Sequence, residues 1–244
     1  MIPPSGEQHE LAFGDQRAVV VEVGGGLRTY GDVLDGYAVS EMCTSCRGQV
    51  LAPWPNRIED GRYPFDGETH QLPLNEPPYA IHGLVRWASW RAVERGASRV
   101  ALEHVLHPQP GYPFALRLRV EYALGTDGLS VRTVAENVGS RACPFGAGHH
   151  PYIARPADEA LGPGVALDEC RSFSGELRVV DVTVWADEHW PYVQLYTGDD
   201  RADVARRAVA VEPMTCPPNA FNTGEDLLRL EPGDVFEGRW GIAP

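Results

Sequence analysis

The strongest constraint on the fold is a pair of alternating segments in the middle of the chain. From Phe114 to Leu124 every second side chain is apolar, and three of the residues between them are charged. That period of two is typical of a strand with one buried face. A Gly-Thr-Asp-Gly turn at 125–128 leads into a second such segment at 129–138. We therefore expect the two segments to form a β-hairpin.

Similar short apolar segments, separated by turn residues, occur along the rest of the chain. The high content of turn formers, with 26 Gly and 21 Pro, favours many short strands, and no segment keeps a 3.6-residue apolar period over three turns. The pattern predicts an all-β fold, a large antiparallel β-sandwich, with residues 1–244 as one domain because no linker divides them. The further expected strands are Arg17–Val23, Tyr37–Ser40, Trp87–Glu94, Arg99–Leu106, Tyr192–Thr197, Arg207–Glu212 and Val235–Ile242.

Charge and composition exclude several classes of partner. The net charge of −13 would repel a phosphate backbone, so we expect no nucleic-acid partner. No apolar run approaches the ~18 residues that span a bilayer, and the N-terminal residues lack the pattern of a signal peptide. The chain has only five cysteines, and this sparse, odd count argues against a disulfide framework. We expect a cytoplasmic protein with no membrane partner.

Two motifs that could indicate a cofactor are expected to be structural. Cys43-Thr-Ser-Cys46 has the spacing of half a zinc site or of a redox pair, but no second ligand pair follows and no βαβ context surrounds it. Gly24-Gly-Gly26 lacks the lysine of a phosphate-binding loop. We therefore interpret the cysteines as buried or incidental thiols and the glycines as a turn, and we expect no metal and no cofactor.

Polar residues at three places are candidates for a site. Adjacent side chains on extended chain point in opposite directions, so only one of His149 and His150 is expected to face a pocket. Glu212 ends an apolar strand and precedes an irregular loop, a position that fits either an active-site carboxylate or a solvated one. The proline-rich stretch 51–80 is unsuited to central strands and is typical of a segment that builds the rim of a pocket.

Several of these segments, taken in chain order, resemble the aldose 1-epimerase (galactose mutarotase) family. A single Asn-Arg-Ile triplet would be a weak signal, whereas six segments in the family's order, spread over most of the chain, make a specific one. The family fold is a large antiparallel β-supersandwich, in agreement with the strand pattern. The matching segments are residues 49–58 (ending Asn-Arg-Ile), 61–67 (Gly-x-Tyr-x-Phe-Asp-Gly), 81–84 (Ile-His-Gly-Leu), 150–152 (His-Pro-Tyr), 194–198 (Gln-x-Tyr-Thr-Gly) and 212–222 (Glu-Pro to Asn).

The resemblance implies a role for each matching polar residue. Glu212 matches the family's general base, which takes the proton from the anomeric hydroxyl. His150 matches the general acid, which protonates the ring oxygen. The residues implied to bind the sugar are Arg57, His82, Asp168, Gln194 and Asn56.

A Glu–His pair fits this chemistry because ring opening removes a proton from O1 and delivers one to the ring oxygen. Each positioned acid or base typically contributes ~10²–10⁴ in rate. The reaction requires an ionised glutamate and a protonated histidine, and we expect that state at rest. Trp54, Trp87 and Phe145 are candidates to pack on a sugar face, although core packing explains each equally well.

The resemblance has one departure, a segment between Tyr152 and Asp168 that is shorter than the family's usual one. The main expectation is a cofactor-independent isomerase, a mutarotase acting on a free aldohexose such as galactose or glucose. We expect a small-molecule sugar as its partner and a monomer or homodimer as its state.

Two alternatives stay open. A hexose-6-phosphate 1-epimerase would use the same acid–base pair with basic side chains on the phosphate, for which Arg57, Arg62 and Arg86 are available. A non-catalytic carbohydrate-binding relative would explain the short segment. A glycosidase fits less well because it typically needs two carboxylates across the scissile bond.

Overall fold

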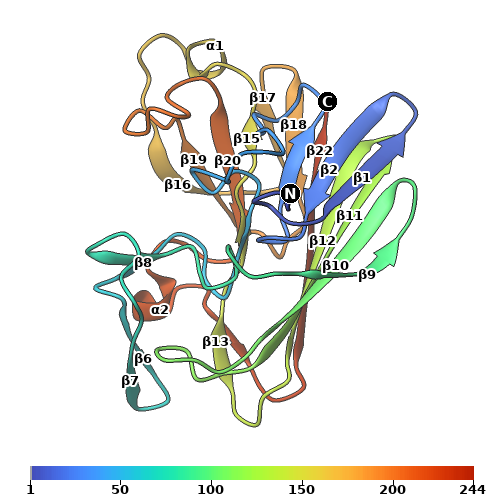
Figure 1. Ribbon diagram of the computed structural model, residues 1–244. Coiled ribbons are helices and arrows are strands. Elements are labelled where there is room, and N and C mark those ends of the chain that lie inside the picture. Colours follow the sequence, from blue (N-terminus) through green and yellow to red (C-terminus); the bar gives the residue numbers. More distant parts are fainter. Residues whose placement is uncertain (1) are drawn as a thin grey trace.

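The computed structural model describes residues 2–244, and its framework is built from strands (Figure 1). Each neighbouring pair in the largest sheet is antiparallel. This sheet has seven strands, in the order β17 (Glu176–Val179), β18 (Val182–Ala186), β22 (Val235–Ala243), β12 (Gly128–Asn137), β11 (Leu116–Gly125), β10 (Arg99–Leu106) and β9 (Arg91–Arg95).

A second antiparallel sheet contains most of the short strands of the C-terminal half. Its order is β16 (Asp168–Ser172), β19 (Tyr192–Tyr196), β20 (Val209–Met214), β14 (Gly148–His149) and β4 (Val50–Leu51), and β15 (Tyr152–Ile153) also pairs with β20. This sheet carries the strand that ends near Glu212, so it determines where the candidate base lies.

Smaller sheets and two short helices complete the structure. The small sheets are β1 (Gln8–Phe13), β2 (Gln16–Val21) and β3 (Leu27–Tyr30); β13 (Cys143–Phe145) with β21 (Leu228–Leu230); β5 (Arg57–Glu59) with β8 (Tyr79–Ile81); and β6 (Arg62–Phe65) with β7 (Glu68–Gln71). The helices are α1 (Ala157–Leu161) and α2 (Ala220–Thr223). Within residues 2–244, neither helix has the length or the apolar run needed to cross a bilayer.

The two large sheets share one apolar core. On β11 the alternate residues from Leu116 to Leu124 are buried, and β12 pairs with β11 from Gly128 to Asn137, as the alternation predicts. Val120 of β11 and Val211 of β20 belong to the same cluster of buried side chains. Full burial of such a side chain contributes about 1.5–3 kcal/mol. The prediction of an all-β sandwich is confirmed.

Two predicted strands differ from the observed structure. The strand expected from Trp87 begins only at Arg91, because a turn in which Ala88 N donates to Val85 O occupies the preceding residues. The strand expected at 37–40 is wrong. There the Tyr37 carbonyl accepts a hydrogen bond from the Arg28 side chain at 2.7 Å, so it has a side-chain partner in place of a neighbouring strand.

The proline-rich stretch contributes no central strand to either large sheet, as predicted, and its strands form the two-stranded sheets β5–β8 and β6–β7. Only its first residue, Leu51, belongs to a large sheet, as part of β4. Figure 1 shows β6, β7, β8 and α2 together on one side of the molecule, beyond the six-stranded sheet. This group brings the loops after β4 and β8 toward the end of β20.

Candidate active site

One pocket collects all seven polar residues that the sequence nominates for the site. Its volume is about 440 Å³, within the usual range for small-molecule sites. The nominated residues come from the loop after β4, strand β5, the loop after β8, the β14–β15 junction and strands β16, β19 and β20. They are Asn56, Arg57, His82, His150, Asp168, Gln194 and Glu212.

Glu212 and His150 lie in direct contact at the base of this pocket. His150 Nε2 is 3.3 Å from Glu212 Oε1, and the side chains are 5% and 2% exposed. Glu212 Oε2 and His150 Nδ1 have no hydrogen-bond partner among the described residues. Buried polar atoms left without partners are costly in a protein interior, which is typical of a place where a polar ligand supplies the missing bonds.

The backbone around His150 explains why it faces the pocket while its neighbour does not. Gly48 N donates to His150 O at 2.8 Å, and His150 N donates to Gln49 O at 3.2 Å. His149 points to the other side, where its Nε2 lies 2.8 Å from Thr133 Oγ1 and its ring packs against two buried tryptophans. Only one of the paired histidines lines the pocket, as expected for extended chain.

The pocket wall that contains Asn56 and His82 has an unusual backbone conformation. Asn56 and His82 have φ values of 49° and 61°, in the left-handed region that non-glycine residues seldom adopt. His82 N donates to Asn56 O at 2.7 Å, which joins the two turns. Gly83 must be glycine, since a Cβ there would lie 2.0 Å from Ala52 O. Such residues cost about 1–3 kcal/mol each and cluster at functional sites.

Side-chain hydrogen bonds orient the remaining nominated residues. Asn56 Oδ1 accepts from Arg57 N at 2.9 Å and from Arg57 Nε at 3.0 Å. On the opposite wall Gln194 Nε2 donates to Asp168 Oδ1 at 2.6 Å, and β19 places Gln194 directly beside Glu212. Gln194 Oε1 has no partner among the described residues. The pocket therefore presents oriented donors and acceptors next to the Glu–His contact.

Burial controls the protonation of the pair. Burial, with a smaller contribution from the Asp168 charge, raises the pKa of Glu212 well above its usual value. Burial lowers the pKa of His150 to about 3. Both directions favour a protonated Glu212 beside a neutral His150, which contradicts the expected resting state of an ionised glutamate and a protonated histidine. In either form the pair carries one titratable proton, and the two facing atoms lie 3.3 Å apart.

Comparison with known proteins identifies the family. The family model described as aldose 1-epimerase matches residues 17–173. The uncharacterized protein YihR of Escherichia coli (strain K12) is 35% identical over 283 aligned positions, which cover 94% of this chain and 90% of YihR. The chain belongs to the aldose 1-epimerase family.

Two further proteins are similar to this chain, one in sequence and one in fold. Human galactose mutarotase is 31% identical over 114 residues, which cover 43% of this chain and 31% of the human protein. The crystal structure of the GalM/aldose epimerase homologue from C. elegans matches with a TM-score of 0.81 at 15% identity, over 97% of this chain and 98% of that one. At that identity the structural match shows the shared fold alone.

Several pocket residues of this aldose 1-epimerase family member were not nominated from the sequence. Glu76 and Arg201, which are 125 residues apart in the sequence, form an ion pair, and no sequence motif links them. Tyr79, Tyr196 and Asp200 also line the pocket. None of residues 153–167, the shortened segment, lines it. In this family member the loop after β19 supplies wall residues instead.

The three aromatic candidates for sugar packing separate into two groups. Trp87 lines the pocket and is 54% exposed, so its ring is accessible to a ligand. Trp54 and Phe145 are buried in the core, and neither lines the pocket. The core interpretation therefore holds for Trp54 and Phe145.

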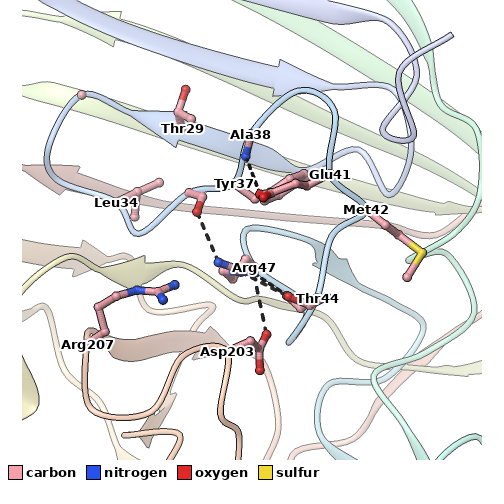
Figure 2. A pocket seen from close by; sticks show the side chains of 12 residues that line it. Thr29, Leu34, Tyr37, Ala38, Glu41, Met42, Thr44, Arg47, Asp203 and Arg207 are labelled. Carbon is pink, nitrogen blue, oxygen red and sulfur yellow. Dashed lines mark hydrogen bonds and ion pairs between the residues drawn. The ribbon is translucent and has the colours of Figure 1, made fainter. Parts of the chain in front are cut away.

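A second, larger hollow of about 850 Å³ lies beside the first and contains none of the nominated residues (Figure 2). Both arginines that line it are already paired with carboxylates. Arg47 lies 3.8 Å from Asp35 and 3.7 Å from Asp203, and Arg207 donates two hydrogen bonds to Asp35. This hollow offers no acid–base pair, so the candidate active site is the smaller pocket.

The buried histidines of this family member predict a loss of stability in acid. Burial lowers the pKa of His149 to about 3, like that of His150. A group whose pKa is depressed by folding costs stability as the pH falls from its unfolded value near 6.5 toward 3, by about 1.4 kcal/mol per histidine and pH unit. Protonation of the buried Glu212 acts in the opposite direction over the same pH range, so the histidine contribution is measured as the slope of unfolding free energy, obtained with urea, against pH and not as a net change.

A variant isolates the contribution of one histidine. In His149→Gln the side chain can still bond Thr133 but no longer titrates, so the slope of stability against pH should become shallower. The same slope of stability against pH in His149→Gln and in the parent protein would contradict this account of the buried histidine.

Proposed function

We propose that the chain is a cofactor-independent aldose 1-epimerase that interconverts the α and β anomers of a free aldohexose such as galactose or glucose. The observation that carries the proposal is the buried contact between His150 Nε2 and Glu212 Oε1. Anomeric oxygen and ring oxygen are bonded to the same carbon, so two groups in contact can reach both. The galactose mutarotase relatives support this substrate class.

The proposed reaction proceeds through the open-chain sugar. Sugar binding draws the shared proton from Glu212 to His150, which creates the base and the acid together. Glu212 takes the proton from the O1 hydroxyl, the C1–O5 bond breaks with its electrons moving to O5, and His150 Nε2 gives its proton to O5. Rotation about C1–C2 turns the aldehyde over, and the same two groups close the ring in reverse.

The remaining nominated residues orient the sugar in this proposal. Asp168 and Gln194 on one wall would bind hydroxyl groups, and Arg57, Asn56 and His82 would bind oxygens on the other. Positioning of this kind lowers the barrier because the reacting atoms are already aligned.

A hexose 6-phosphate is the second candidate substrate, because three arginines line the pocket. They are Arg57, Arg86 and Arg201. Arg62, which the sequence also made available, is exposed on β6 and does not line it. Against this candidate, Glu76, Asp168 and Asp200 line the same pocket and offset the positive charge, and Arg201 is already paired with Glu76. The balance favours an uncharged sugar.

Exchange spectroscopy by NMR tests the function and ranks the substrates. At equilibrium, magnetisation transfer between the α and β anomeric protons measures the rate for each sugar without a coupling enzyme. We expect acceleration with galactose or glucose that exceeds the acceleration with glucose 6-phosphate. A preference for glucose 6-phosphate would favour the second candidate. Sugar binding without any acceleration would indicate a non-catalytic relative.

The proposed place of action is the cytoplasm. All five cysteines are free thiols in the structure, as expected for a reducing compartment.

A further inference from the structure

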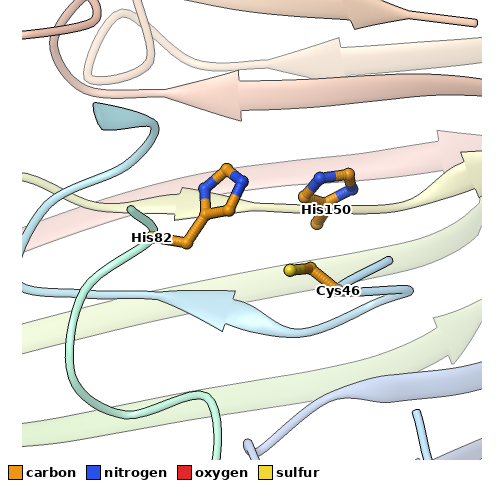
Figure 3. A group of neighbouring side chains, drawn as sticks. All are labelled: Cys46, His82 and His150. Carbon is orange, nitrogen blue, oxygen red and sulfur yellow. The ribbon is translucent and has the colours of Figure 1, made fainter. Parts of the chain in front are cut away.

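Three potential metal ligands meet inside the pocket. They are the Cys46 thiol and the imidazole rings of His82 and His150, and one ligand atom from each lies within 4.8 Å of the other two. Figure 3 shows the thiol and the two rings grouped around a common space. The three residues lie far apart in the sequence, and Cys43-Thr-Ser-Cys46 is the one local motif that contains any of these ligands as a metal-type pair.

The two histidines are buried and incompletely bonded. Counted over the whole residue, His82 is 7% exposed and His150 is 4% exposed. Nδ1 of each ring has no hydrogen-bond partner among residues 2–244. Imidazole nitrogens without partners in a buried position are available to coordinate an ion.

The backbone and one neighbouring side chain direct the thiol into the pocket. Ser45 and Cys46 have φ values of 51° and 56°, two consecutive non-glycine residues in the left-handed region. Arg86 Nη1 donates to Cys46 Sγ at 2.8 Å and would offset the charge of a thiolate. Cys46 is therefore held in a strained turn with its sulfur facing the two rings.

We propose that Cys46, His82 and His150 form a binding site for a borderline-soft divalent cation of the Zn²⁺ class, and that the bound ion blocks the sugar pocket. Sulfur and imidazole are the ligands that zinc prefers, and three protein ligands with one open position make a known type of zinc site. Zinc–ligand distances of ~2.0–2.3 Å require ligand atoms ~3.3–3.8 Å apart, and a pair at the 4.8 Å limit reaches this separation by moving together by ~1–1.5 Å. Binding releases the thiol proton to solvent.

The blocking part of this inference rests on the proposed function, because His150 is the proposed acid. An ion coordinated by His150 removes that ring from proton transfer and occupies space next to the Glu–His contact. Sugar and ion should therefore exclude each other, which would make the protein reversibly inhibited by zinc.

Titration of the metal-free protein with Zn²⁺, in competition with a chromophoric chelator, tests the site directly. We expect one equivalent to bind, with affinity at least ~10-fold weaker in Cys46→Ser, since even indirect changes at metal sites cost ~10–100-fold. Cys170→Ser is the matched control, because Cys170 is a part-buried thiol on β16 outside the group, and its affinity should equal that of the parent. Stoichiometric binding that is equally tight in Cys46→Ser would overturn the site, as would the absence of stoichiometric binding.

A second measurement does not depend on the stability of the variant. Co²⁺ bound to the parent protein should show thiolate-to-cobalt charge-transfer absorption that persists in Cys170→Ser, and its absence overturns the site. Adding zinc to the anomer-exchange assay then separates the two proposals. Cys46-dependent binding without any anomer exchange would leave the metal site standing and reject the epimerase function. Anomer exchange unaffected by saturating Zn²⁺ would reject the blocking inference alone.

Discussion

Glu212→Gln is expected to lower the catalysed rate of anomer exchange by ~10²–10⁴-fold, the contribution of one positioned base. The amide keeps the size and shape of the side chain but cannot accept the O1 proton. Sugar binding should be retained, because Arg57, Asp168 and Gln194 are unchanged. Exchange NMR gives the rate, and calorimetric titration gives the sugar affinity. Full activity in this variant would reject the assigned role.

The same variant should be more stable than the parent, and the gain should grow with pH. Burial raises the pKa of Glu212 above its unfolded value near 4.5, so the parent loses stability as the pH rises from 4.5 through the raised pKa. Glutamine does not titrate and avoids this loss. Urea unfolding at pH 5 and pH 8 should show a larger advantage at pH 8. Loss of activity together with loss of stability would point to misfolding rather than chemistry.

His150→Gln is expected to lower the catalysed rate by a similar ~10²–10⁴-fold, since no group then donates a proton to the ring oxygen. The stacked contact between the His150 and Tyr152 rings, with centroids 5.1 Å apart, would also be lost, so folding must be checked by circular dichroism. His107→Gln changes an exposed histidine outside the pocket and serves as the control. A folded His150→Gln protein with parental activity would show that the acid lies elsewhere.

The sequence was most informative where one physical requirement dominates. The period-two pattern of β11 predicted its buried face because each inward side chain must be apolar, and the turn at Gly125–Gly128 predicted that β11 and β12 form a hairpin. The strand predicted from Tyr37 was wrong. An apolar pattern only a few residues long could not reveal that the Arg28 side chain donates a hydrogen bond to the Tyr37 carbonyl. Short segments carry too little pattern to separate a strand from a packed loop.

For the candidate site too, the sequence predicted some residues and missed others. The motif resemblance nominated residues such as Glu212 and His150 that the structure places in one pocket. It could not reveal the meeting of Arg201 with Glu76, or of Cys46 with His82, because long-range contacts depend on the whole fold. The protonation of the pair was also missed, since it depends on burial that no local sequence pattern encodes.

Polarimetry on freshly dissolved α-D-galactose tests the central claim most directly. Mutarotation proceeds slowly in water, and the decay of optical rotation reports the net conversion of one anomer into the other. The account predicts that the protein accelerates this decay without added metal or cofactor and that Glu212→Gln at equal concentration does not. A parent protein that binds galactose or glucose yet leaves the decay at the rate of buffer alone, or a Glu212→Gln variant as fast as the parent, would contradict it.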